Sequence, residues 1–177
     1  MMPRRPAQKP FPRLNSLVLL SLCNYLLVVV SWVEALYAYP RLPGQISLWL
    51  NFFGHEIPRA DKSWLFFIYP LVQSLCVLGG MLFFRARRAS KPAGESVRSG
   101  VTAETEARVR SLKTEHVLLA LIFVNLIFIH LQTSLILLAH RIGTGMNKVY
   151  FASLFVVILA LIPYYRIREK MILQRRL

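Results

Sequence analysis

Six polar or ionisable side chains lie within strongly apolar stretches of this chain, where such side chains are uncommon: Asn24, Glu34, Gln73, Asn125, His130 and Gln132. Amide groups donate and accept hydrogen bonds, and a carboxylate or an imidazole at membrane depth can also carry a proton. Two kinds of chemistry therefore fit these residues: hydrogen bonds that hold helices together, or a path for a proton or an ion.

Glu34 and His130 are the ionisable members of this set. We expect the Glu34 carboxylate near the outer boundary of its stretch, reaching headgroup water or pairing with Arg41, His55 or His140, unless it takes part in proton coupling. We expect His130 near mid-depth, either as a hydrogen-bonded core histidine or as a proton carrier. The residue types alone leave both alternatives open.

The sequence lacks the motifs of common enzymes. It has no zinc-protease, nucleotide-loop, dinucleotide or EF-hand spacing and no Gly-x-Ser-x-Gly elbow. Its four histidines are scattered, and Cys23 and Cys76 lie in apolar runs without a basic neighbour that would stabilise a thiolate. We therefore predict no catalytic residue, no metal site and no cofactor, and a protein that is not an enzyme.

The elements that must position the polar residues are four long apolar runs, at 14–39, 63–84, 116–139 and 149–165. A helix that crosses a bilayer needs about 20 mostly apolar residues, so each run qualifies. Of the 177 residues, 55% are hydrophobic and 17% are charged, against roughly 25% charged in soluble domains. The chain is therefore predicted to be an all-α integral membrane protein with four transmembrane helices.

The first run resembles a signal peptide because basic residues precede it. A signal peptide, however, has an apolar core of about 7–15 residues and small residues around its cleavage site. Here the run is longer, and Leu36 stands two residues before Ala38. We therefore predict a retained transmembrane helix.

The distribution of charge predicts the orientation. Seventeen of the 22 Lys and Arg residues lie before the first run, between the second and third, or after the fourth, and five lie in 40–62 and 140–148. Because Lys and Arg mark the cytoplasmic side, both termini are predicted to be cytoplasmic, in a cell membrane of the bacterial inner-membrane type. The positive charge then reflects topology and contact with anionic lipid, and no nucleic-acid partner is predicted.

The regions outside the spans divide the chain further. Residues 1–13 and 166–177 are predicted to be basic cytoplasmic tails, and 85–102 a flexible basic loop. A cytoplasmic helix is predicted to begin near Ala103 and to run into the third span, so that 103–165 forms a second helical pair. Pro70 predicts a kink in the second span, and Pro163 is predicted to end the fourth.

The outer segment 40–62 is broken by prolines and glycines around the apolar stretch 46–53. This stretch is too short to span, and its pattern fits a strand or one face of a helix equally well. Either way, an apolar, aromatic patch is predicted to rest on the outer interface or to cap the bundle. The candidate recognition residues in it are Pro43, Trp49, Asn51, Phe52, Phe53 and Gly54.

Between the first two spans, a set of residues matches a known signature: Leu42, Pro43, Ile46, Asn51, Gly54 and Lys62. With its flanking spans (roughly 14–84), it resembles the bacterial domain of unknown function that occurs at the N-terminus of SdpI-like immunity proteins and in many small membrane proteins. The chain departs from that pattern at Ser47 (Pro in the family), Trp49 (His) and Leu50 (Phe), and it lacks the Asp that follows Gly54. The resemblance implies a similar loop shape; a ligand held by that His and Asp would be lost or changed. For SdpI itself, the resemblance implies toxin immunity and signalling through a membrane receptor.

The angular positions of the polar residues predict how the helices pack. Asn125 and Gln132 point the same way, and His130 points nearly opposite to Gln132. A helix with two polar faces is contacted on both sides, so the third span is predicted to lie between neighbours. The fourth span, with few polar residues, is predicted at the periphery or at an oligomer contact.

Together these observations favour a non-enzymatic role in interaction, envelope signalling or immunity, in which the outer segment recognises a protein partner or lipid. The alternative is a small transporter or channel component that uses the polar layer, as a homo-oligomer because four spans enclose little space. A third interpretation is that the polar residues only hold the module together and specificity lies in a partner.

Overall fold

The computed structural model describes residues 13–47, 50, 59–89, 103–142 and 146–174. Its long helices are α1 (Arg13–Ala38), α2 (Ile68–Ala89), α3 (Ala103–Ala139) and α4 (Lys148–Gln174). Within the described residues, four helices are long and apolar enough to cross a membrane. The prediction of an all-α, four-span membrane protein is thereby confirmed.

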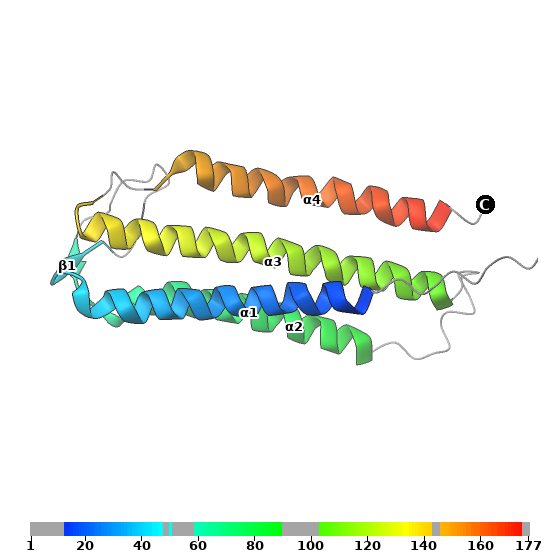
Figure 1. Cartoon of the computed structure of the whole chain (residues 1–177), viewed down its shortest axis with the longest axis horizontal. Coiled ribbons are helices and arrows are strands. Elements are labelled where there is room, and N and C mark those ends of the chain that lie inside the picture. The colour runs from blue at the N-terminus through cyan, green and yellow to red at the C-terminus, as the bar shows by residue number, and fades with distance from the viewer. Residues whose placement is uncertain (1–12, 48–49, 51–58, 90–102, 143–145, 175–177) are drawn as a thin grey trace, which may run out of the picture.

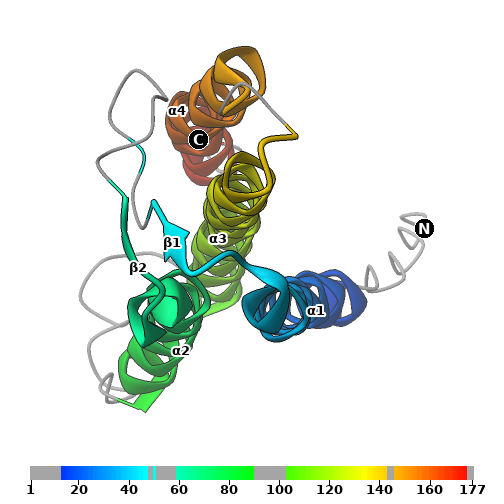
Figure 2. The same cartoon turned by 90° about the vertical axis from the view of Figure 1, so that its left-hand side faces the viewer.

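The four helices run side by side along the long axis of the molecule (Figure 1). Viewed from the end, α3 lies in the centre, with α1 and α2 on one side of it and α4 on the other (Figure 2). Helix α3 packs against all three of the others, whereas the extensive contacts of α4 are with α3. This arrangement confirms the prediction that the third span lies between neighbours and the fourth at the periphery.

Much of the helix surface is apolar and exposed. Leu22 and Leu26 on α1, for example, are 60% and 62% exposed. In a bilayer these side chains contact lipid tails, which are as apolar as leucine and therefore provide no hydrophobic force for helix association. Helix packing in this molecule has to come from close approach and from hydrogen bonds.

Close approach occurs where α2 crosses α3. A Cβ atom added at Gly80 would lie 2.9 Å from the Cδ1 atom of Leu121, which is closer than real carbon atoms come. Glycine at this position therefore lets the two helices approach each other, as small residues do at helix interfaces in membranes.

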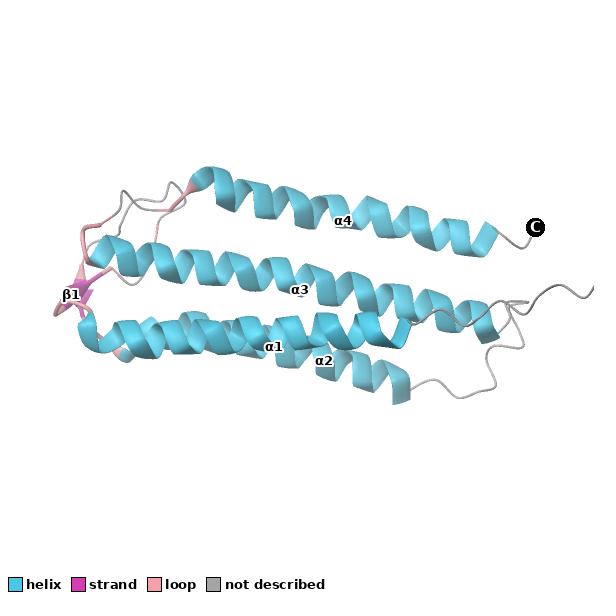
Figure 3. Cartoon of the chain, viewed as in Figure 1, coloured by secondary structure: helices cyan, strands magenta, loops and turns pink. Residues whose placement is uncertain are grey.

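The end of the bundle where α1 connects to α2 contains the short elements, and the strands are magenta in Figure 3. The 3-10 helix η1 (Tyr39–Arg41) follows α1, and η2 (Trp64–Phe67) precedes α2. Between them β1 (Gln45–Ile46) pairs antiparallel with β2 (Ala60–Asp61). Of the stretch 46–53, Ile46 is thus in a strand, and most of the rest lies outside the described residues.

Lys62 holds the two ends of the outer segment together. Its backbone N–H donates to the carbonyl of Gly44 at 2.7 Å. Its Nζ donates to the carbonyls of Leu42 at 3.3 Å and Pro40 at 3.5 Å, and it lies 4.8 Å from the centre of the Tyr39 ring. The strand pair is therefore tied to the ends of both α1 and α2.

Pro70, where a kink was predicted, lies just after a change of helix type. The second span begins as the 3-10 helix η2 and changes to an α-helix at Ile68, so that Pro70 is the third residue of α2. In the first turn of an α-helix a backbone N–H has no partner within the helix, and proline is tolerated there.

The prediction that Pro163 ends the fourth span is wrong, because α4 continues through it to Gln174. Residues 166–174, predicted as part of a basic tail, are therefore helical. Proline removes one backbone hydrogen bond and destabilises a helix. Beyond it, α4 is stabilised by packing and ion pairs against α3 through Tyr165, Arg168 and Glu169. Helix α2 likewise continues to Ala89, into the predicted loop 85–102, of which 90–102 lie outside the described residues.

Candidate functional site

Polar side chains gather at the interface of α1 and α3, in two groups separated by two helical turns. In the first group, Asn24 is fully buried; its Nδ2 donates to the carbonyls of Leu118 on α3 at 3.0 Å and Leu20 on α1 at 2.9 Å. Asn125 Nδ2 donates to Asn24 Oδ1 at 2.8 Å. Each amide thus bonds to the opposite helix, where lipid supplies no competing water.

The second group lies two helical turns further along α1, nearer the end of the bundle that leads into segment 40–62. The Ser31 hydroxyl donates to Gln132 Oε1 at 3.0 Å, and Gln132 Nε2 donates back to the carbonyl of Ser31 at 3.0 Å. Gln132 Nε2 also donates to Glu34 Oε2 at 3.1 Å, and Thr133 Oγ1 donates to Glu34 Oε1 at 2.6 Å. Ser31 and Gln132 are fully buried, so this group holds the helices in one register.

The Glu34 contacts differ from the prediction. Neither Arg41 nor His140 pairs with its carboxylate, and His55 lies outside the described residues. The Arg41 guanidinium instead lies 3.6 Å from the centre of the Tyr37 ring and donates to the Tyr37 carbonyl at 2.6 Å. Arg41 is two helical turns from Glu34 but only one turn from Tyr37, so its guanidinium contacts Tyr37 rather than Glu34.

The opposite face of α3 carries His130, as predicted. Its ring meets the ring of Tyr150 on α4 at 4.7 Å and an angle of 62°. Its Nε2 is buried and has no hydrogen-bond partner within the described part of the chain. Thr133, three residues further along α3, contacts α1 through Glu34.

Gln73 stands apart from the other predicted polar residues. It is fully buried in α2, and neither its Oε1 nor its Nε2 has a partner in the described ranges. The nearby bond from Trp32 Nε1 to Ser74 Oγ, at 3.0 Å, links α1 to α2 without it. The polar layer is therefore a network across α1 and α3, to which α2 contributes an isolated amide.

An aromatic cluster covers the outer ends of α1 and α2. The Tyr39 ring contacts the rings of Trp64 at 5.4 Å, Phe67 at 4.9 Å and Phe66 at 6.1 Å. Trp64 is 78% exposed, as expected for an indole at a membrane interface, whereas Phe66 is buried with Ala35, Leu42 and Ile46.

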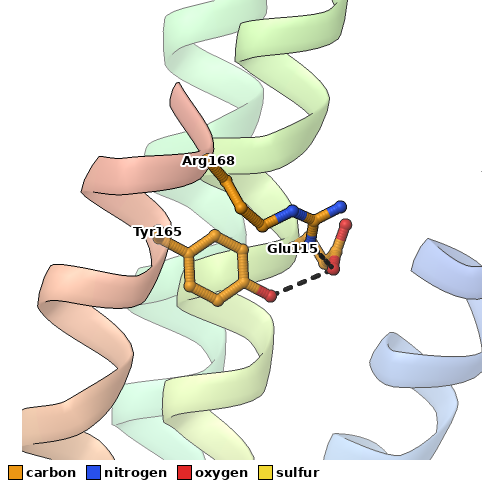
Figure 4. Close-up of polar contacts among 3 residues, drawn as sticks. All are labelled: Glu115, Tyr165 and Arg168. Atoms are coloured by element: carbon orange, nitrogen blue, oxygen red, sulfur yellow. Dashed lines mark hydrogen bonds and ion pairs between the residues drawn. The ribbon is translucent and has the colours of Figure 1, made fainter. Parts of the chain in front are cut away.

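At the opposite end, an ion-pair cluster that the sequence analysis missed joins α3 to α4. Glu115 Oε1 accepts a hydrogen bond from the Tyr165 hydroxyl at 3.0 Å and pairs with Arg168 Nη1 at 3.3 Å (Figure 4). Lys113 pairs with Glu169 at 2.8 Å, and the His116 ring stacks on Tyr165 at 4.5 Å. The i, i+3 and i, i+4 spacing of Tyr165, Arg168 and Glu169 places them on one face of a helix, and this pattern could have predicted the cluster.

Of the predicted outer-loop residues, Pro43 is exposed between η1 and β1. The others, Trp49, Asn51, Phe52, Phe53 and Gly54, lie outside the described residues. Among the described residues there is no group of three or more His, Cys, Asp or Glu side chains that could hold a metal ion. Cys23 and Cys76 are free thiols.

Comparisons with protein-family models, with curated proteins and with solved structures gave no match. The resemblance of residues 14–84 to the SdpI-associated domain therefore stays a prediction. What the fold defines is a class: a multi-pass membrane protein that contacts the lipid bilayer.

Proposed function

We propose that this chain is a non-enzymatic membrane protein that recognises a partner at its outer face, with a role in envelope signalling or immunity. The observation that carries this proposal is the use of the polar side chains within the spans. Asn24, Ser31, Glu34 and Gln132 are engaged with partners across one helix interface. Side chains occupied in this way stabilise a scaffold rather than line a path.

The base of the outer segment supports the same proposal. The segment between Ile46 and Ala60 connects β1 to β2, and Lys62 ties this strand pair to the end of α1. The aromatic cluster around Tyr39 braces the same end. A segment held at both ends loses less conformational entropy on binding than a free loop, which favours recognition.

The location we propose is the bacterial inner membrane, with both termini cytoplasmic. The excess of Lys and Arg in the terminal and middle segments supports this orientation. The start of α1 and the end of α4 also lie at the same end of the bundle (Figure 1). The partner is a protein or a second copy of the chain, and no nucleic acid is involved.

Quantitative cross-linking in native membranes tests the proposal. With a photoreactive residue at position 50, Phe52→Ala or Phe53→Ala is expected to lower the yield of one cross-linked partner at least fivefold. Gln73→Leu, a matched change inside the membrane, should leave the yield unchanged. Equal yields in all three variants would contradict recognition by the outer segment.

A second candidate, a transporter or channel component, is favoured by one observation. The amide of Gln73 and the Nε2 atom of His130 are buried without partners in the described part of the chain, and such groups can bind water or an ion on a path through the membrane. This candidate predicts ion flux in proteoliposomes that is lost in Gln73→Leu and kept in Phe53→Ala.

A further inference from the structure

A groove opens on the side of the molecule between α1 and α3, beside the second polar group. It has a volume of about 440 Å³ and is lined by Val29, Val30, Val33, Glu34, Tyr37, Ile129 and Thr133. This volume falls in the range of small-molecule sites, which is about 300–1,000 Å³. Val33 and Tyr37 are 60% and 65% exposed, so the groove is open to the surrounding lipid.

The Glu34 carboxylate is the one carboxylate in this lining. It accepts hydrogen bonds from two neutral donors, the Thr133 hydroxyl and the Gln132 amide. No Lys, Arg or His side chain of the described ranges pairs with it. A carboxylate oxygen can accept a further hydrogen bond, and a negative charge in an apolar setting is costly without a positive partner.

The rest of the lining selects for an alkyl chain. Val29, Val30, Val33 and Ile129 present only methyl and methylene groups to the groove. Next to Tyr37, the Arg41 guanidinium lies over the ring at the outer end of α1. Its positive charge disfavours entry of a cation from the aqueous side, so a ligand is expected to enter sideways from the bilayer.

The geometry points to a binding site for a lipophilic amine, with its ammonium group on the Glu34 carboxylate and its alkyl chain along the valines of α1. A single-chain amine fits better than a phospholipid with an ethanolamine headgroup. The phosphate of such a lipid would bring a second negative charge towards Glu34, and like charges at short distance repel. The site is separate from the outer segment, so the inference goes beyond the proposed function.

Calorimetric titration of the full chain in phosphatidylcholine nanodiscs tests this site, with empty nanodiscs as the background. Dodecylamine is expected to bind saturably at one site per chain, at least tenfold more tightly than dodecanol of the same chain length. Glu34→Gln keeps the size of the side chain and should reduce the affinity for dodecylamine to that for dodecanol. Glu104→Gln removes an exposed carboxylate at the other end of α3 and should change nothing.

A second variant keeps the test decisive if Glu34→Gln does not fold. Val33→Trp fills the groove from an exposed position and should weaken dodecylamine binding at least fivefold while Glu34 stays in place. Equal affinity for dodecylamine and dodecanol would mean that the groove binds only the alkyl chain, and this result would overturn the inference. Unchanged binding of dodecylamine in Glu34→Gln, or a signal no larger than that of empty nanodiscs, would also overturn it. The same holds if phosphatidylethanolamine in the nanodisc occupies the site instead.

Discussion

Helix α3 meets α1 and α4 through different chemistry. Against α1 it uses buried amides and hydroxyls within the span, among them Asn125 and Gln132. Against α4 it uses ring contacts and, towards the end where α4 terminates, ion pairs such as Glu115 with Arg168. Water cannot replace a hydrogen bond inside the bilayer, whereas water and salt weaken an ion pair near its surface. We conclude that α1 and α3 form the fixed part of the bundle and α4 the more easily detached part.

The largest effect is expected from removing the side chain that makes the most bonds to α1. Gln132→Leu deletes three hydrogen bonds, which average about 0.6 kcal/mol and reach about 1.7 kcal/mol each in membrane proteins. We expect a loss of about 2–4 kcal/mol in the free energy of unfolding in detergent–lipid micelles. The exposed Leu137→Ala is the control, and an equal loss in both variants would contradict the assignment.

Gly80→Val tests the close approach of α2 to α3. The added methyl groups would clash with Leu121, and overpacking of this kind costs about 1–3 kcal/mol. The neighbouring Gly79 has open space where its Cβ would lie. Gly79→Ala should therefore be neutral or stabilising in the same unfolding measurement, and similar losses in both variants would show that the helices are not close here.

Glu115→Gln tests the α3–α4 side of the comparison. Tyr165 is buried, but the Glu115 and Arg168 side chains are 32% and 33% exposed, so the loss is expected to stay below about 1 kcal/mol. Raising the salt concentration should shrink the difference between Glu115→Gln and the wild type, because salt screens exposed ion pairs. The effect of Gln132→Leu should not depend on salt. A salt-dependent effect of Gln132→Leu would contradict the difference described between the α1–α3 and α3–α4 contacts.

The smallest effect is expected at the end of α3. Arg141 has a φ of 58°, and the N–H of Ile142 donates to the carbonyl of Leu137 at 3.0 Å, as in a Schellman motif. This conformation favours glycine, so Arg141→Gly should stabilise the fold by about 0.5 kcal/mol, which is the backbone strain it relieves less the conformational entropy that glycine loses. Thermal unfolding monitored by circular dichroism would detect it, and a lower melting temperature would show that Arg141 makes a needed contact.

The sequence predicted which faces of the helices pack, but not which atoms meet. Asn125 and Gln132 are seven residues apart and were expected on one face, and both contact α1. The contacts of Glu34 with Gln132 and Thr133 were not predicted, because periodicity gives a direction and not a side-chain conformation. That Gln73 has no hydrogen-bond partner among the described residues likewise depends on packing that one helix does not encode.

The end of α4 was missed for a different reason. Hydropathy falls after Tyr165, where Arg166 and Arg168 follow, and Pro163 was expected to end the helix. The helix continues because Arg168 and Glu169 find partners on α3, a long-range contact. The two short strands are held in the same way by Lys62, far from β1 in sequence.

The account depends on the buried polar network between α1 and α3, and a double-mutant cycle tests it most directly. Asn24→Leu and Asn125→Leu, alone and combined, should show a favourable coupling of about 0.6–1.7 kcal/mol in the free energy of unfolding, because Asn125 donates to Asn24 at 2.8 Å. Additive losses, with no coupling between the two positions, would mean that these amides do not join the helices and would contradict the arrangement described.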